Sequence, residues 1–122
     1  MAQSSNLTFE EYYKAITRLE EAIAQPKNDF IRDSVIQRFE FSIELAWKSA
    51  KKAMGTSTSS PKDVIREMAQ SGYIQAPDVW LKAIDMRNLS SHTYKEDLAE
   101  QVYDFVVSFV PELKSLKTKL EK

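Results

Sequence analysis

Apolar residues recur every three or four positions along most of this chain, which is the spacing of one face of an α-helix. The first apolar stripe consists of Tyr12, Ile16, Leu19 and Ile23. Thr8 and Glu11 have the spacing of a capping box, in which two side chains close the start of a helix. Because Pro26 follows the stripe, the pattern predicts a helix from about Thr8 to about Pro26.

A second and longer stripe predicts a helix from Asp29, as the N-cap, to about Met54. One arc of this helix forms a predicted core face, which consists of Val35, Ile36, Phe39, Ile43, Ala46, Trp47, Ala50 and Met54. Phe30, Phe41 and Leu45 fall roughly on the opposite side. A helix that is apolar on two sides is either central in a bundle or shared with a partner chain. Both interpretations stay open on the sequence.

Two shorter helices are marked by proline and glycine. Residues 55–60 (GTSTSS) form a predicted loop. Ser60 as N-cap, Pro61 at the first helical position and Gly72 as the C-terminal stop then predict a short helix. Pro77 lies in the first turn of a fourth predicted helix, APDVWLKAIDMRN.

A long final helix is predicted after Thr93 and Glu96, which repeat the capping-box spacing. Its stripe consists of Leu98, Val102, Phe105, Val106 and Phe109. Pro111 is expected to kink or interrupt the helix, after which leucines continue the pattern. With no convincing strand and with short connections, the elements predict an all-α fold: an antiparallel up-and-down bundle of about five helices.

Composition narrows the class of protein. A chain of 122 residues is one domain by length, spanning 1–122, with 1–6 and about 117–122 expected to fray. It has no cysteine and one histidine, so thiolate and multi-histidine zinc sites are excluded and we expect no metal or other cofactor. No apolar run approaches about 18 residues and no signal peptide is recognisable, so we expect a cytoplasmic protein that does not associate with membranes.

The single histidine lies in the polar segment RNLSSHTY. On an unbroken helix, Arg87 and His92 would point about 140° apart and could not act on one atom. Either the helix ends between them, or a second subunit brings its own copy of the segment across an interface. Ser90, Ser91 and Thr93 favour the first of these, because their hydroxyls compete with helical hydrogen bonding.

If the helix ends there, a polar and partly exposed corner would contain Arg87, Asn88, Ser91, His92 and Tyr94. A simpler interpretation is that Arg87 pairs with Asp85 or Glu96 and that His92 only ends a helix. One reaction needs no more than an imidazole and a guanidinium, and that is metal-independent RNA cleavage. The imidazole moves protons near neutral pH, and the guanidinium binds two phosphate oxygens.

Three segments carry a resemblance that covers nearly the whole chain: RFEFSIELAWKSAKKAM (38–54), SPKDVIREMAQSGYI (60–74) and WLKAIDMRNLSSHTY (80–94). They resemble the HEPN superfamily, in the branch that contains nucleotidyltransferase substrate-binding proteins and the toxins of HEPN–minimal nucleotidyltransferase pairs. The last segment fits the family pattern of arginine, polar residue, short spacer, histidine, any residue and tyrosine. The matching positions are Arg87, Asn88, His92 and Tyr94.

The resemblance implies a helical bundle that forms a homodimer, with two copies of the motif facing each other across a composite cleft. Arg87 and His92 would be catalytic, and Asn88 and Ser91 supporting. The implied function is that of a toxin of a prokaryotic toxin–antitoxin pair, a metal-independent ribonuclease that cuts tRNA or mRNA. A cognate minimal nucleotidyltransferase would use ATP to adenylylate Tyr94 and so neutralise the toxin.

A non-enzymatic alternative stays open. Related chains were first interpreted as non-catalytic subunits that position substrate for a nucleotidyltransferase, and residues 38–74 resemble those equally well. In that case Arg87 and His92 would hold a nucleotide phosphate without cleaving anything. Because the net charge is −1, any RNA contact needs a local basic patch. One candidate patch is Lys48, Lys51 and Lys52, and the other is formed by lysines at 114–122. Either patch could instead be an ordinary solvated face.

Overall fold

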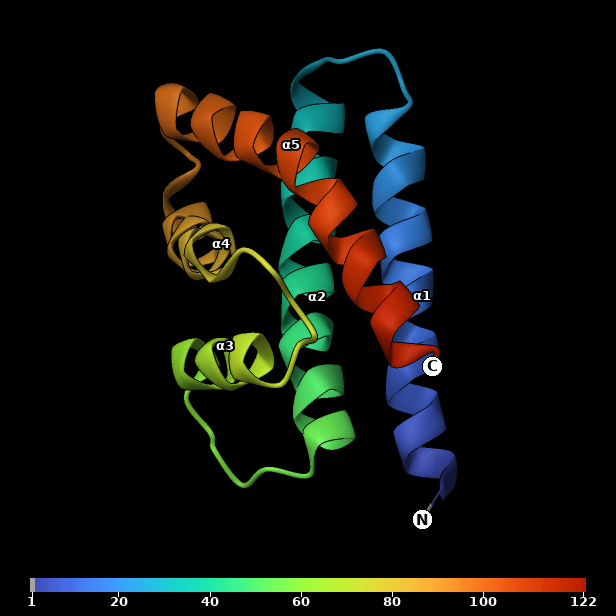
Figure 1. The fold of residues 1–122 in the computed structure, drawn as a ribbon. Helices are drawn as coiled ribbons and strands as arrows, with labels where there is room; N and C mark the ends of the chain where they lie inside the picture. The colour runs from blue at the N-terminus through green and yellow to red at the C-terminus, as the bar shows by residue number, and fades with distance from the viewer. Residues whose placement is uncertain (1) are drawn as a thin grey trace.

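The computed structural model describes residues 2–122, with side chains from residue 7 onward, and these residues form an all-α bundle (Figure 1). The helices are α1 (Ala2–Ile23), α2 (Asp29–Met54), α3 (Pro61–Gln70), α4 (Pro77–Leu89), the short 3₁₀-helix η1 (Ser90–His92) and α5 (Glu96–Leu120). The described part of the chain contains no strand, which confirms the predicted fold class. Over residues 2–122, no helix combines the length and the apolar composition that a membrane span requires.

The α2 helix lies at the centre of the bundle and contacts each of the other four α-helices. α1 runs antiparallel beside α2, α5 crosses this pair, and α3 and α4 lie against α2 on the side away from α1 (Figure 1). This central position accounts for the predicted core face of α2, of which every residue is buried except the half-buried Met54. Phe30 and Phe41, on the opposite side, stay exposed. The second apolar side of α2 is therefore not covered by the chain itself.

Aromatic rings fill the middle of the core. Trp80 of α4 is fully buried, and its ring centroid lies 4.9 Å from that of Phe109 of α5. Phe39 of α2 meets Phe109 edge to face at 6.2 Å. The buried Tyr12 of α1 donates a hydrogen bond of 2.7 Å from its hydroxyl to the backbone oxygen of Leu113. These contacts join α1, α2, α4 and α5 into one core and hold α4 in place.

The first helix begins earlier than its capping pattern predicts. α1 starts at Ala2, so Thr8 lies inside the helix and the predicted start near it is wrong. Residues 2–6 belong to the helix, and the expected fraying of residues 1–6 stays a prediction; Met1 lies outside the described residues. The spacing of Thr8 and Glu11 is a short local pattern, and continued helix satisfies the same backbone groups.

The ends of α2 agree with the sequence to within one residue. Asn28, not Asp29, is the N-cap, because its side-chain oxygen accepts a 2.8 Å hydrogen bond from the backbone N–H of Ile31. At the other end, Gly55 has φ of 68°, the left-handed conformation that favours glycine, and its N–H donates to the last turn.

The predicted boundaries of the two shorter helices are confirmed. Pro61 and Pro77 occupy the first position of α3 and α4. Gly72, with φ of 82°, follows the end of α3 at Gln70. Ser60 precedes α3 as predicted, although its side chain makes no capping hydrogen bond.

The final helix differs from the prediction at its start and at Pro111. Its N-cap is Lys95, and the hydroxyl of Thr93 donates a hydrogen bond to the backbone oxygen of Ser90 instead of capping α5. Pro111 lies inside the helix without ending it, although α5 changes direction partway along its length (Figure 1). The helix continues to Leu120, and the expected fraying from about residue 117 stays a prediction.

Candidate active site at the end of the fourth helix

The end of α4 is shaped by side-chain hydroxyls. α4 stops at Leu89 and tightens into the 3₁₀ turn η1, as the sequence predicts for the segment between Arg87 and His92. Ser90, Ser91 and Thr93 each donate to the backbone oxygen three residues earlier, over 2.5, 3.0 and 3.0 Å. These bonds satisfy carbonyls that would otherwise continue the α-helix. The break turns His92 away from the register that it would have on α4.

Arg87 is half-buried and makes contacts on two sides. Its guanidinium forms an ion pair with the half-buried carboxylate of Glu44 on α2, and it donates a 3.0 Å hydrogen bond to the side-chain oxygen of Asn88. The simpler interpretation, in which Arg87 pairs with Asp85 or Glu96, is not what the structure has. Arg87 is thus oriented by a carboxylate from another helix.

Glu40 also reaches this corner from α2. The hydroxyl of Ser90 lies 2.5 Å from a carboxylate oxygen of Glu40. Glu40 and Glu44 are four residues apart, so they lie on one face of α2 and present two carboxylates to the end of α4. The sequence analysis missed both residues. Their four-residue spacing was the available signal, but it does not reveal which element they face.

His92 is the last residue of η1 and Tyr94 lies in the turn between η1 and α5; both are exposed. Their rings meet edge to face with centroids 6.0 Å apart. The side chain of Tyr94 is 77% exposed, so its hydroxyl is open to solvent and to a partner. Within the described side chains, no hydrogen bond joins this pair to Arg87 and Glu44. One chain therefore provides two separate groups: the guanidinium of Arg87, which is paired with Glu44, and the exposed imidazole of His92, which lies beside the ring of Tyr94.

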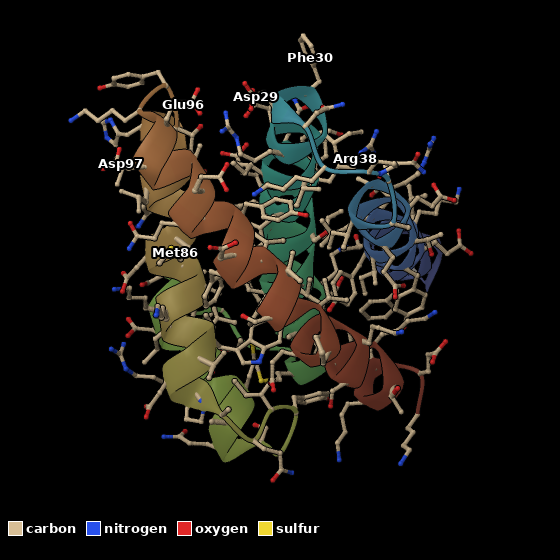
Figure 2. All side chains as sticks on the ribbon, turned by 90° about the horizontal axis from the view of Figure 1, so that it is seen from above. Asp29, Phe30, Arg38, Met86, Glu96 and Asp97 are labelled. Carbon is tan, nitrogen blue, oxygen red and sulfur yellow. The ribbon has the colours of Figure 1, made fainter. Side chains whose placement is uncertain are left out.

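A buried arginine fixes the start of α5, and so the turn that carries Tyr94. Arg32 of α2 is only 3% exposed, and its guanidinium lies 2.6 Å from Glu96 and 3.1 Å from Glu100. Hydrogen bonds to these carboxylates hold the pKa of Arg32 above its ordinary value, so it stays charged. Lys27 also pairs with Glu100. Figure 2 shows Asp29 on α2 and Glu96 on α5 at the same end of the molecule.

The side chains of this corner could act on a phosphate ester. Arg87 can bind phosphate oxygens in place of Glu44, and the exposed His92 can exchange protons with a bound ligand. Across the residues that the structure describes, no three histidine, aspartate or glutamate side chains are arranged to hold a metal ion. We refer to residues 87–94, together with Glu40 and Glu44, as the α4–η1 corner.

Comparison with known proteins places the whole chain, including this corner, in a family. A family model described as nucleotidyltransferase substrate binding protein like matches residues 7–122. Among curated proteins, the probable ribonuclease HepT of Haemophilus influenzae is 31% identical over 102 residues, which cover 77% of this chain and 70% of that protein.

Two solved structures share the fold. A crystal structure of a protein from Thermus thermophilus has a TM-score of 0.83 and 29% identity, and the match covers 91% of this chain and 99% of the other. A Haemophilus influenzae protein, described as having the fold of a substrate binding domain of a nucleotidyltransferase, has a TM-score of 0.72 and 27% identity over 100% of both chains. The likeness therefore includes the helices that form the α4–η1 corner.

Proposed function

Because this chain belongs to the family of nucleotidyltransferase substrate binding protein-like proteins, we propose that it is a metal-independent ribonuclease, the toxin of a pair whose antitoxin is a nucleotidyltransferase. The observation that carries the proposal is the α4–η1 corner, where Arg87 and His92 lie on either side of a break in the helix. The similarity to a probable ribonuclease, HepT, supports it. The proposed substrate is cellular RNA, either tRNA or mRNA.

The proposed reaction uses the 2′-hydroxyl of the RNA as the nucleophile. The 2′-oxygen attacks the adjacent phosphorus, the bond from phosphorus to the 5′-oxygen breaks, and the products are a 2′,3′-cyclic phosphate and a 5′-hydroxyl. A base takes the proton from the 2′-hydroxyl and an acid supplies one to the 5′-oxygen, which are the roles of His92. Arg87 stabilises the charge that develops on the phosphate oxygens. Asn88 supports it by accepting a hydrogen bond from the guanidinium.

A homodimer would complete this chemistry. The reaction needs both a base and an acid, and each chain has one histidine. α2 has an uncovered face on which Phe30 is 87% exposed and Phe41 is 53% exposed. Phe41 lies three residues before Glu44, so it neighbours the carboxylate that holds Arg87. A two-fold dimer through this face would bring two α4–η1 corners towards each other.

Tyr94 is the proposed site of neutralisation. In adenylylation, the phenolic oxygen attacks the α-phosphorus of ATP, pyrophosphate leaves and the phenol loses its proton. The exposed hydroxyl of Tyr94 is accessible for this reaction, and its ring lies beside His92. An attached AMP would place a phosphate near the cations that the RNA backbone would use. The modified toxin would then be unable to bind RNA productively.

A second function remains supported, that of a non-catalytic substrate-binding subunit of a nucleotidyltransferase. The family description and the Haemophilus influenzae structure favour it. In that case the α4–η1 corner would bind a nucleotide phosphate, and no RNA would be cut. Expressing the chain in cells with and without a partner nucleotidyltransferase, followed by sequencing of RNA ends, separates the two functions. The ribonuclease proposal predicts new RNA ends and growth arrest only without the partner; unchanged RNA ends would contradict it.

A further inference from the structure

A groove runs between α1 and α2 on the flank away from α4. It consists of three adjoining hollows: Arg18 and Arg38 line both the first and the second, and Leu45 lines both the first and the third. The first hollow has a volume of about 260 Å³. Six basic side chains line the groove: Lys14, Arg18, Arg38, Lys48, Lys51 and Lys52.

The groove is much more positive than the molecule as a whole. Its six basic side chains face only two acidic ones, Glu11 and Glu21, in a chain whose net charge is −1. Within the described residues, Lys14, Arg18 and Lys51 have no ion-pair partner. Such a concentration of uncompensated charge attracts an anionic ligand.

The lysines at the end of α5 form a weaker candidate for the same role. Lys114 pairs with Glu20 at 3.1 Å, and the amino group of Lys117 lies 5.1 Å from the ring centroid of Tyr13. Two of these lysines are therefore already engaged by the chain itself. The hollow that includes Lys114 is otherwise lined by Glu20 and apolar side chains.

We propose that the groove between α1 and α2 binds the phosphate backbone of single-stranded RNA, an inference that rests on the proposed ribonuclease function. Proteins that hold single strands combine a positive groove with apolar or aromatic surface, and here Phe41 and Leu45 line the groove beside its cations. The basic positions on α2 extend from Arg38 to Lys52, which is about 21 Å along a helix. That length accommodates a few nucleotides.

The groove also leads towards the α4–η1 corner. Phe41 precedes Leu45 by four residues and Glu44 by three, so it is adjacent on the helix surface to both. Leu45 lines the groove, whereas Glu44 holds Arg87. The groove therefore supplies sequence-independent affinity, and the corner supplies the cleavage.

The test measures binding of a fluorescent single-stranded RNA of about 12 nucleotides by anisotropy. All proteins carry His92→Ala to prevent cleavage. The test protein adds Lys14→Glu and Arg18→Glu, both on exposed positions of α1. The matched control adds Lys119→Glu and Lys122→Glu, which change the net charge equally at the end of α5. A protein with Lys14→Gln and Arg18→Gln replaces the test protein should the double reversal not fold, as judged by circular dichroism.

The groove reversal is expected to weaken RNA binding about tenfold or more, and the control reversal to leave it within about twofold. The slope of log affinity against log salt should fall by about 1.4, because two phosphate contacts are lost. Equal affinities for the two double variants would overturn the inference. So would polyglutamate competing as well as unlabelled RNA, since that would identify an acidic protein segment as the occupant. Groove-dependent RNA binding in this series, together with a separate assay in which the wild-type protein cuts no RNA, would support the groove while refuting the ribonuclease proposal.

Discussion

The guanidinium of Arg87 is oriented for the proposed contact with phosphate, but it is already paired with other side chains of the chain. Glu44 and Asn88 orient it, and a phosphate must displace the carboxylate to bind in a bidentate manner. The imidazole of His92, in contrast, is exposed and lies beside the ring of Tyr94. Because the α-helix breaks after Leu89, the side chains of Arg87 and His92 point in different directions from those they would have on one continuous helix. Orientation of the cation and openness of the imidazole are therefore set by different contacts.

The first prediction concerns how Arg87 and His92 act together. Arg87→Ala and His92→Ala should each lower the rate of RNA cleavage by at least about 100-fold. Because both groups serve one transition state, the double variant should be little worse than either single variant. Single-turnover kinetics on a defined RNA measure all three rates. Losses that multiply in the double variant would show instead that the two residues act in separate steps.

The second prediction concerns Tyr94. Tyr94→Phe removes only the hydroxyl from an exposed ring, so the fold and the contact with His92 should be kept. This variant should still cut RNA but escape neutralisation by the partner nucleotidyltransferase. Mass spectrometry of the wild-type protein purified with its partner should find AMP on the peptide that contains Tyr94. An unmodified peptide, with normal neutralisation of Tyr94→Phe, would refute adenylylation.

Among the elements, boundaries marked by glycine and proline were predictable, and those assigned to threonine were not. Pro61, Pro77 and Gly55 act through their own backbone preferences, which hold in any context. A threonine hydroxyl has several uses. Thr93 donates back to Ser90 and does not cap α5, and Thr8 lies within a longer helix. A side chain with several local partners gives an ambiguous boundary.

Pro111 was expected to kink or interrupt the last helix, and tertiary packing explains why it does not end it. Phe109 and Leu113, on either side of the proline, are almost completely buried. Burying two such side chains stabilises the fold by about 3–6 kcal/mol. This exceeds or matches the cost of about 3 kcal/mol for a proline inside a helix. Sequence patterns show the proline but not the core that holds the helix around it.

The third prediction concerns the joint between α2 and α5. Arg32→Met keeps the length of the side chain but removes its hydrogen bonds to Glu96 and Glu100, and should lower the free energy of unfolding by about 1–2 kcal/mol at pH 7. Hydrogen bonds from Lys27 and Arg32 lower the pKa of Glu100 in the folded protein. Their stabilisation is thus present above the unfolded pKa of Glu100 and is lost as the pH falls through its folded pKa.

The measurement for this prediction is urea unfolding of wild type and Arg32→Met between pH 7 and pH 3. The difference in unfolding free energy should be constant at neutral pH and should shrink below about pH 4.5, the range in which Glu100 protonates. A difference that stays the same at pH 3 would mean that Arg32 stabilises the fold through packing of its stem and not through its charge.

For the molecule as a whole, the sequence named candidate site residues but not the side chains from other helices that contact them. Arg87, His92 and Tyr94 lie within one short segment, so a local pattern was enough to select them. Glu44 lies 43 residues before Arg87 and reaches it only because α4 packs against α2. No local pattern encodes that contact. Because α2 is apolar on two sides, the sequence indicated that it is either central in the bundle or shared with a partner chain. The structure shows α2 at the centre, and the exposed Phe30 and Phe41 keep the interpretation of a shared face open.

The fourth prediction concerns assembly. Phe41→Glu places a charge on the exposed face of α2 and should convert the proposed dimer into a folded monomer with little ribonuclease activity. Val107→Glu is the matched control, because it adds the same charge at an exposed apolar position of α5. Light scattering after size-exclusion chromatography gives the mass of each protein. A dimer that survives Phe41→Glu would place the interface elsewhere.

The proposed ribonuclease activity is tested most directly by measuring RNA cleavage by the purified wild-type chain and by His92→Ala, both in the presence of EDTA. We expect wild type to cut RNA despite the chelator and to leave 2′,3′-cyclic phosphate ends, while the variant leaves the RNA intact. An RNA that stays whole with wild type, or that His92→Ala cuts at the wild-type rate, would contradict it.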